Sequence, residues 1–401
     1  MIITFTRDKL NFINNGKEGY KMINSEVLEI RKQFKHENTA ITKFSGCYID
    51  GEKTIVTKFT ETFLCMPEEE TFKYFEIFKK TLSGTLGKNL IHMEFPLETE
   101  FNGGPQEFLL KLRDSELKDE ALLDEFYQRI IDMYDYTGNY LILLVYSAYD
   151  VPGKTNDNIL MDDASEEVYR FILCSICPVN LSKPGLSYNN ETNQIQKRIQ
   201  DWVVSMPMNG FLFPAFNDRS TDIHSFLYYS KNPEELHKDF IDQMFGCQVP
   251  LSAGSQKETF QALITETLGD ECEYEIVKNI HEKLNEIMEE HKLKEIPEPL
   301  TLDKTEVKNL FAESGVREEK LVELEKNYDM VTGENVSLLA TNIANTRTFE
   351  VKTPDVVIKV NPERTDLIET KMVDGRRCLV IEINDQVEVN GVVVKPTCQN
   401  E

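Results

Sequence analysis

Four short apolar strings in the middle of the chain limit the folds that it can form. They span residues 140–146, 168–179, 200–205 and 210–216, and Gly, Pro, Asn and Asp separate them. Each string is bulky and of strand length, and two of the joins are too short to hold a helical crossover. The sequence therefore predicts a mostly antiparallel sheet over this region.

Patterns of other periods flank these strings. Residues 40–63 predict a β-hairpin, because β-branched and aromatic residues stand on both sides of a turn sequence. Apolar residues recur at helical spacing over 105–113 and 119–134, and again over 256–268 and 271–292. The expected fold is therefore α+β and multi-domain. It has a helical N-terminal part, a central mostly antiparallel sheet with helices, and a small C-terminal β module.

A chain of 401 residues is too long for one ordinary core, so several domains are expected. The charged segment around Pro297 and Pro299 is stiffened by proline, as linkers often are. The expected parts are a probable leader or disordered arm (1–21), an N-terminal hairpin with helices (22–138), a central α+β domain (139–293), a linker (294–303), a helical hairpin (304–335) and a C-terminal β module (336–396).

The first part is expected to precede the native start. The codons of Glu18 and Gly19 must read as a purine-rich tract that resembles a bacterial ribosome-binding site. Met22 follows at a suitable distance and opens a capped amphipathic helix. We therefore expect initiation at Met22.

Charge and apolar content restrict the possible partners and the compartment. The chain carries 69 acidic against 44 basic side chains, a net charge of −25, which repels nucleic acid and anionic membranes. No apolar run approaches the length of a membrane span, and the N-terminus lacks the apolar core of a signal peptide. Eight irregularly spaced cysteines suit free thiols in a reducing compartment. A cytoplasmic location is expected, with no membrane partner.

Five strings together carry a family resemblance: residues 79–90, Tyr149-Asp-Val-Pro152, Cys177-Pro-Val179, Gly210-Phe-Leu-Phe-Pro-Ala-Phe216 and Val360-Asn-Pro-Glu-Arg364. With them, the chain resembles the uncharacterised bacterial domain-of-unknown-function family 4317 from about Met22 to Val394. The resemblance implies a cytosolic bacterial protein and implies nothing about chemistry. A shorter stretch, residues 349–383, is similar to the closing β segment of the bacterial nucleoid-associated protein family.

The densest group of polar side chains follows the last apolar string. Reactive groups often lie on loops at strand ends, and Asp, Arg, Ser and His together could act as an acid–base set. The same residue types also build turns and caps, and an arginine there can pair with a carboxylate. The candidate catalytic residues are Asp150, Asp218, Arg219, Ser220, Asp222 and His224.

No pattern in the sequence predicts a metal or a cofactor. Cys174 and Cys177 form a C-x-x-C pair, but both lie inside an apolar strand string and no second pair stands at zinc-binding spacing. None of the six histidines forms a metal-binding pair on a helix. The two cysteines are expected to be buried strand residues.

Three functions stay open at this point. The leading hypothesis is a non-catalytic interaction or regulatory protein whose partners are other proteins. The first alternative is a nucleic-acid-associated, nucleoid-type protein that binds through the nearly neutral C-terminal module. The second is a hydrolase or transferase that uses the Asp218–His224 loop. The candidate nucleic-acid contacts are Arg347, Lys352, Lys359, Lys371, Arg376 and Arg377.

Overall fold

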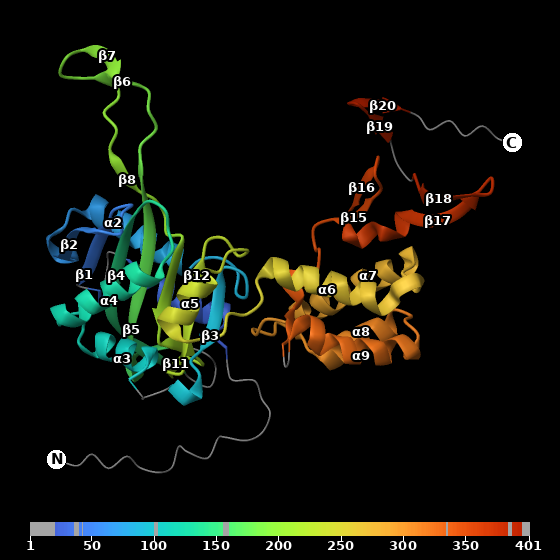
Figure 1. The fold of residues 1–401 in the computed structure, drawn as a ribbon, viewed down its shortest axis with the longest axis horizontal. Coiled ribbons are helices and arrows are strands. Elements are labelled where there is room, and N and C mark those ends of the chain that lie inside the picture. Colours follow the sequence, from blue (N-terminus) through green and yellow to red (C-terminus); the bar gives the residue numbers. More distant parts are fainter. Residues whose placement is uncertain are drawn as a thin grey trace, which may run out of the picture. The chain divides into compact units, whose positions relative to one another are not determined.

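The computed structural model describes residues 21–35, 40–41, 43–99, 103–154, 160–333, 336–383 and 387–394, and they form two compact units (Figure 1). Unit 1 holds the described residues up to Ser83 together with Leu90–Lys231 and Asp239–Cys247. Unit 2 holds Gly84–Asn89, Asn232–Lys238 and the described residues from Gln248 onward. Most of the segment expected to be a leader, residues 1–20, lies outside the described part of the chain.

An eight-stranded sheet forms the centre of unit 1, and every pair of neighbouring strands in it is antiparallel. The strand order is β2-β1-β4-β5-β9-β12-β3, and β8 pairs with the end of β5. The strands are β1 (Lys43–Ile49), β2 (Ile55–Thr62), β3 (Leu90–Glu94), β4 (Asn139–Lys154), β5 (Leu160–Leu181), β8 (Trp202–Val204), β9 (Asn209–Phe213) and β12 (Ser225–Ser230). The predicted antiparallel sheet and the α+β class are confirmed.

Helices cover both faces of this sheet. Helix α2 (Glu68–Thr81) covers one face, where the hydroxyls of Thr81 and Ser175 are 2.6 Å apart. Ser175 pairs with Gly210 across β5 and β9, so Phe211 points to the opposite face. On that face the Phe211 ring lies 6.3 Å from the ring of Phe126 in α4. The helices of this second layer are α3 (Pro105–Asp114), α4 (Glu120–Met133) and α5 (Lys238–Phe245).

The domain boundary expected between residues 138 and 139 does not separate two units. The hairpin at 40–63 forms as predicted, but its first strand pairs with β4, for example at Phe44 and Val145. The N-terminal hairpin is thus one edge of the central sheet. The periodicity of a strand shows which side chains share a face, but it does not show which other strand it pairs with. Here that pairing determines the extent of unit 1.

Unit 2 is built on helices that share one core. They are α6 (Ala253–Leu268), α7 (Tyr274–Leu293), α8 (Lys304–Glu313), α9 (Glu318–Thr332) and the short α10 (Ala340–Ile343). Phe260, Leu284, Phe311 and Leu324, from four different helices, lie buried in the same apolar cluster. The expected linker, residues 294–303, therefore lies inside unit 2. At its end, β13 (Thr301–Leu302) pairs with β14 (Leu338–Leu339).

The described residues of the C-terminal module form three separate strand pairs, not one sheet. These pairs are β15 (Phe349–Lys352) with β16 (Val357–Val360), β17 (Ile368–Val373) with β18 (Arg376–Ile381), and β19 (Val387–Val389) with β20 (Val392–Val394). The single-turn segments are η2 (Phe63–Cys65), η3 (Leu97–Thr99), η4 (Gly269–Glu271) and η5 (Pro362–Leu367). Within the described residues, no helix is long and apolar enough to cross a membrane.

A short loop between α2 and β3 belongs to unit 2, although both elements that flank it belong to unit 1. The amide of Asn342 donates a hydrogen bond to the carbonyl of Gly87 at 3.1 Å. Gly87 has a φ of 76°, and a Cβ added there would lie 2.2 Å from Cδ1 of Leu339. The chain therefore leaves unit 1 within a few residues and returns to it.

Cleavage in the exposed segment after α7 should not separate the chain into two free pieces. Lys294, which directly follows α7, is exposed, so limited trypsin treatment is expected to cut there. The fragments should co-elute from a sizing column, because α6 and α7 on one side and α8 and α9 on the other share the core of unit 2. Denaturant should then separate them. Release of a free C-terminal fragment under native conditions would contradict the shared core.

Candidate functional site

The polar segment that follows β9 folds as a tight β-hairpin. Strand β10 (Ala215–Asn217) pairs with β11 (Ser220–Asp222), and Asn217 lies opposite Ser220. The two residues between them, Asp218 and Arg219, have φ values of 48° and 54°. Positive φ at both central positions defines a type I′ turn, which favours Asn, Asp and Gly. The polar composition of this segment is thus explained locally by the turn.

Arg219 ties this hairpin to helix α1 (Asn24–Arg31) and to strand β4. Its Nε and Nη2 donate to the two carboxylate oxygens of Glu29 at 3.1 and 2.9 Å, and Nη2 also donates to the carbonyl of Pro152 at 2.9 Å. The Tyr149 hydroxyl donates to the same carboxylate at 2.9 Å. The side chains of Arg219 and Glu29 are 15% and 22% exposed, so water screens the pair only in part.

A second glutamate of α1 holds the backbone of the turn. The carboxylate of Glu26 accepts hydrogen bonds from the backbone N–H groups of Ile23 at 2.8 Å and Arg219 at 3.0 Å. It thereby caps the helix. Burial raises the pKa of Glu26, while these two backbone donors act in the opposite direction. Burial, followed by the hydrogen bond to Glu29, also raises the pKa of Tyr149.

The other candidate residues of the hairpin also have structural partners. The Ser220 hydroxyl donates to Glu167 at 2.8 Å. Asp222 accepts from the side chains of Asn217 at 2.6 Å and Ser225 at 2.5 Å, and from the backbone N–H of His224 at 3.0 Å. A Ser-His-Asp catalytic triad needs a serine hydroxyl bonded to an imidazole that a carboxylate orients. These contacts build a different arrangement, in which the carboxylates accept from the hairpin itself.

Asp150 is not brought into this group. It is exposed in β4, next to Tyr149, and successive side chains of a strand point to opposite faces. Tyr149 reaches Glu29, so Asp150 points away from the Arg219 contacts. Of the six candidate residues, the structure gathers those of the hairpin and leaves Asp150 on the other side of its strand.

A buried histidine lies beside the hairpin and was not among the candidates. His92 in β3 is buried, and its Nδ1 has no hydrogen-bond partner among the described residues. Burial lowers the pKa of His92 to about 4, an effect that the nearby Asp222 carboxylate opposes. The imidazole is therefore neutral in the folded protein at neutral pH.

Stability should fall in mild acid because of His92. The folded-state pKa, about 4, is below the ordinary value of 6.5, so stability is lost as the pH falls from 6.5 towards 4. At pH 5 this loss should be about 2 kcal/mol relative to pH 8. Urea unfolding at pH 5 and pH 8 should show that the free energy of unfolding falls by about 2 kcal/mol less in His92→Gln than in the unchanged protein. Parallel pH profiles of the two proteins would contradict the assignment.

The candidate nucleic-acid contacts lie on separate strand pairs of unit 2. All six basic residues are exposed, and they come from the segment before β15, from β15–β16 and from β17–β18. Two of them are in ion pairs, Lys359 with Glu350 at 3.3 Å and Lys371 with Glu369. Such pairing leaves less positive charge for phosphates than the sequence suggested.

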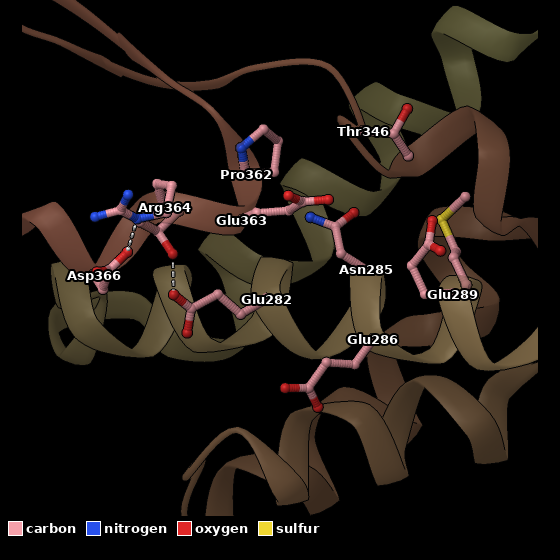
Figure 2. Close-up of a pocket in the computed structure, with 11 residues that line it drawn as sticks. Glu282, Asn285, Glu286, Glu289, Thr346, Pro362, Glu363, Arg364 and Asp366 are labelled. Atoms are coloured by element: carbon pink, nitrogen blue, oxygen red, sulfur yellow. Dashed lines mark hydrogen bonds and ion pairs between the residues drawn. The ribbon is translucent and has the colours of Figure 1, made fainter.

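A pocket in unit 2 is lined by several acidic groups (Figure 2). Its volume is about 510 Å³, and α7 and η5 provide most of its lining. Glu282 accepts a hydrogen bond from Thr365, and the guanidinium of Arg364 is paired with Asp366 at 3.2 Å. The lining residues are Glu282, Asn285, Glu286, Met288, Glu289, Thr346, Pro362, Glu363, Arg364, Thr365 and Asp366. Five carboxylates against one guanidinium make this pocket repel phosphate groups.

The cysteine pair lies where the sequence predicted. Cys174 and Cys177 are fully buried in β5 as free thiols, and burial raises the pKa of both. A raised pKa disfavours the thiolate that redox chemistry and metal binding require. Among the described residues, no group of three or more His, Cys, Asp or Glu side chains is placed to hold a metal ion.

Several exposed apolar residues of unit 1 lie on an arm that continues beyond the sheet, seen at the upper left of Figure 1. We call residues 181–204 the arm. It begins where β5 pairs with β8, and it ends in a hairpin of β6 (Leu186–Asn189) and β7 (Gln194–Lys197). The backbone N–H of Arg198 donates to the carbonyl of Gly185 at 2.9 Å between these two paired regions. The exposed apolar residues are Leu181, Leu186, Tyr188, Ile195, Ile199, Trp202, Val203 and Val204.

The hairpin at the end of the arm has two different faces. Tyr188 lies opposite Ile195, and Leu186 lies opposite Lys197, so these four side chains share one face. The register places Ser187, Asn189, Gln194 and Gln196 on the other face. Leu186 and Ile195 are 75% and 65% exposed. A two-stranded hairpin with one exposed apolar face is only marginally stable by itself.

The sequence predicted a strand at 200–205, which corresponds to β8, but it gave no prediction for β6 and β7. Their four-residue runs are too short and too polar for a strand pattern to stand out. The available signal was the matched alternation of Leu186 and Tyr188 with Ile195 across an asparagine-rich turn.

Comparison with protein-family models defines the class of protein. The family model described as "Domain of unknown function (DUF4317)" matches residues 22–392. The chain belongs to this family, as its sequence resemblance indicated. A search of curated proteins finds no match, and the similarity to nucleoid-associated proteins has no support from the comparisons.

Proposed function

We propose that the chain is a non-catalytic interaction or regulatory protein of the bacterial cytoplasm, and that the arm is a surface through which it binds other proteins. One observation carries this proposal: the apolar face of the β6–β7 hairpin, around Tyr188 and Ile195, is exposed to solvent. Exposed, contiguous apolar surface with a polar border is typical of protein–protein contacts. Tyrosine and tryptophan, both present on the arm, are among the residues that contribute most to such contacts.

The contacts of the Asp218–His224 loop favour this proposal over catalysis. Ser220, Arg219 and Asp222 are each engaged with residues that hold the hairpin, α1 and β5 together. A reacting group must instead be free to meet a substrate in line with its acid or base. These contacts therefore explain the loop as a structural connection between the hairpin, α1 and β5.

Site-specific photo-crosslinking in cells tests the proposal. A photoreactive phenylalanine analogue placed at Tyr188 should form covalent adducts with protein, because this position is on the apolar face. The same analogue at Ser187, one residue away on the polar face, is the matched control and should form few adducts. Absence of adducts at position 188, or equal yields at both positions, would contradict a protein-binding role for this face.

A further inference from the structure

We infer that the apolar face of the arm binds the same face of a second copy of this chain, so that two arms stack about a two-fold axis. This inference rests on the proposed function, since it names the partner that the arm binds. Sheet faces stack about 10 Å apart, which would place Leu186, Tyr188 and Ile195 of both copies in one small core. Ser187, Asn189, Gln194 and Gln196 would remain in water on the outer faces. A symmetric contact of this kind leaves neither apolar face uncovered.

Charge restricts a second copy to contact through the arms. The arm carries Lys183, Lys197 and Arg198 against Glu191 and Asp201, a net charge of +1. The rest of the chain therefore carries −26, and two such bodies repel each other. A protruding contact keeps the acidic bodies apart while it buries the apolar faces.

The charged residues of the hairpin also suit a two-fold arrangement. Lys197 lies at the base of the apolar face, opposite Leu186, and Glu191 lies in the turn at its tip. When two arms stack in opposite directions, the base of one meets the tip of the other. Lys197 of each copy then approaches Glu191 of its partner, so the charges are complementary across both halves of the contact.

Self-association through the arms should have a distinctive salt dependence. Added salt screens both the repulsion between the two acidic bodies and the Lys197–Glu191 pairs, but exposed ion pairs contribute little while each body carries −26, so salt should strengthen self-association. Binding of nucleic acid or of an acidic protein through Lys183, Lys197 and Arg198 would instead weaken as salt increases. The sign of the salt effect therefore separates a second copy from an acidic partner.

Sedimentation velocity of the full chain provides the main test, over about 1 to 100 µM protein, a range that detects dissociation constants in the micromolar region. We expect a monomer–dimer equilibrium that shifts towards dimer with salt. Ile195→Thr should raise the dissociation constant at least about 30-fold, as loss of an apolar residue at the centre of a contact does. Gln196→Thr is the matched control: it is the next residue of β7 but on the polar face, and it should leave the equilibrium unchanged.

Several results would overturn the inference: a monomer over the whole range, a dimer that Ile195→Thr does not weaken, or a dimer that salt dissociates. If the purified chain is monomeric but position 188 still crosslinks to a different protein, the proposed function stands and the second-copy inference fails. If position 188 forms no adduct at all, both fail.

Discussion

Replacement of Gly210 with alanine should lower the free energy of unfolding of unit 1 by about 3 kcal/mol or more. A Cβ at this position would lie 2.3 Å from the carbonyl oxygen of Cys174 and 2.6 Å from Cγ2 of Thr81. The carbonyl belongs to the backbone of β5, which pairs with β9 at this point, so no side-chain rotation can relieve the clash. The melting temperature of unit 1 should fall by about 6–12 °C for such a loss, and calorimetry of the full chain would measure it.

Gly185→Ala provides the control for this change. No atom lies within 4 Å of a Cβ added to Gly185, which is an exposed residue of the arm. Its melting temperature should stay close to that of the unchanged protein. If the two variants unfold alike, the close approach of α2, β5 and β9 at Gly210 is wrong.

Replacement of Arg219 with methionine should destabilise unit 1 by about 2–3 kcal/mol, because it leaves a partly buried carboxylate without its cation. Glu29 would keep the Tyr149 hydroxyl but lose both hydrogen bonds from the guanidinium. Its charge would then lie near the carboxylate of Glu26 with nothing to offset it. The loss should appear first as detachment of α1, which hydrogen exchange of residues 24–31 would detect.

A double-mutant cycle gives the coupling within this pair. Arg219→Met combined with Glu29→Gln should cost less than the sum of the single changes, with a coupling of about 1–2 kcal/mol. Lys58→Met is the control: the pair that it breaks, with Asp124, is exposed on both sides, and its loss should cost less than about 0.5 kcal/mol. Full additivity of the Arg219 and Glu29 changes would show that the two side chains do not act as a pair.

The sequence predicted most of the elements whose causes are local. Helix α4 follows its apolar stripe, and Asp119 caps it through the backbone N–H groups of Ala121 and Leu122. Helix α8 begins likewise at Asp303, which forms a reciprocal capping box with Glu306. Periodicity and capping act within a few residues, so one stretch of sequence contains all the information that they need.

What the sequence could not predict depends on residues far apart in the chain. The domain boundary predicted at 138 was wrong because β1 pairs with β4. The sequence of neither strand alone identifies the strand that it pairs with. The candidate loop shows the same limit. Its turn residues were recognisable, but Glu29, the partner that gives Arg219 its role, lies 190 residues away. The β6–β7 hairpin of the arm was missed because its four-residue strands are too short and too polar to stand out as strands.

The loop of residues 84–89 constrains the order in which the two units can fold during synthesis. Both units are interrupted along the chain, so neither can be completed from one continuous stretch. At roughly 5–20 residues per second, a ribosome needs about 10–50 s to proceed from Gly87 to Asn342, its hydrogen-bond partner 255 residues later. Residues up to Cys247 complete unit 1 well before that point. During synthesis, the sheet of unit 1 can therefore form while residues 84–89 still lack their partners in unit 2.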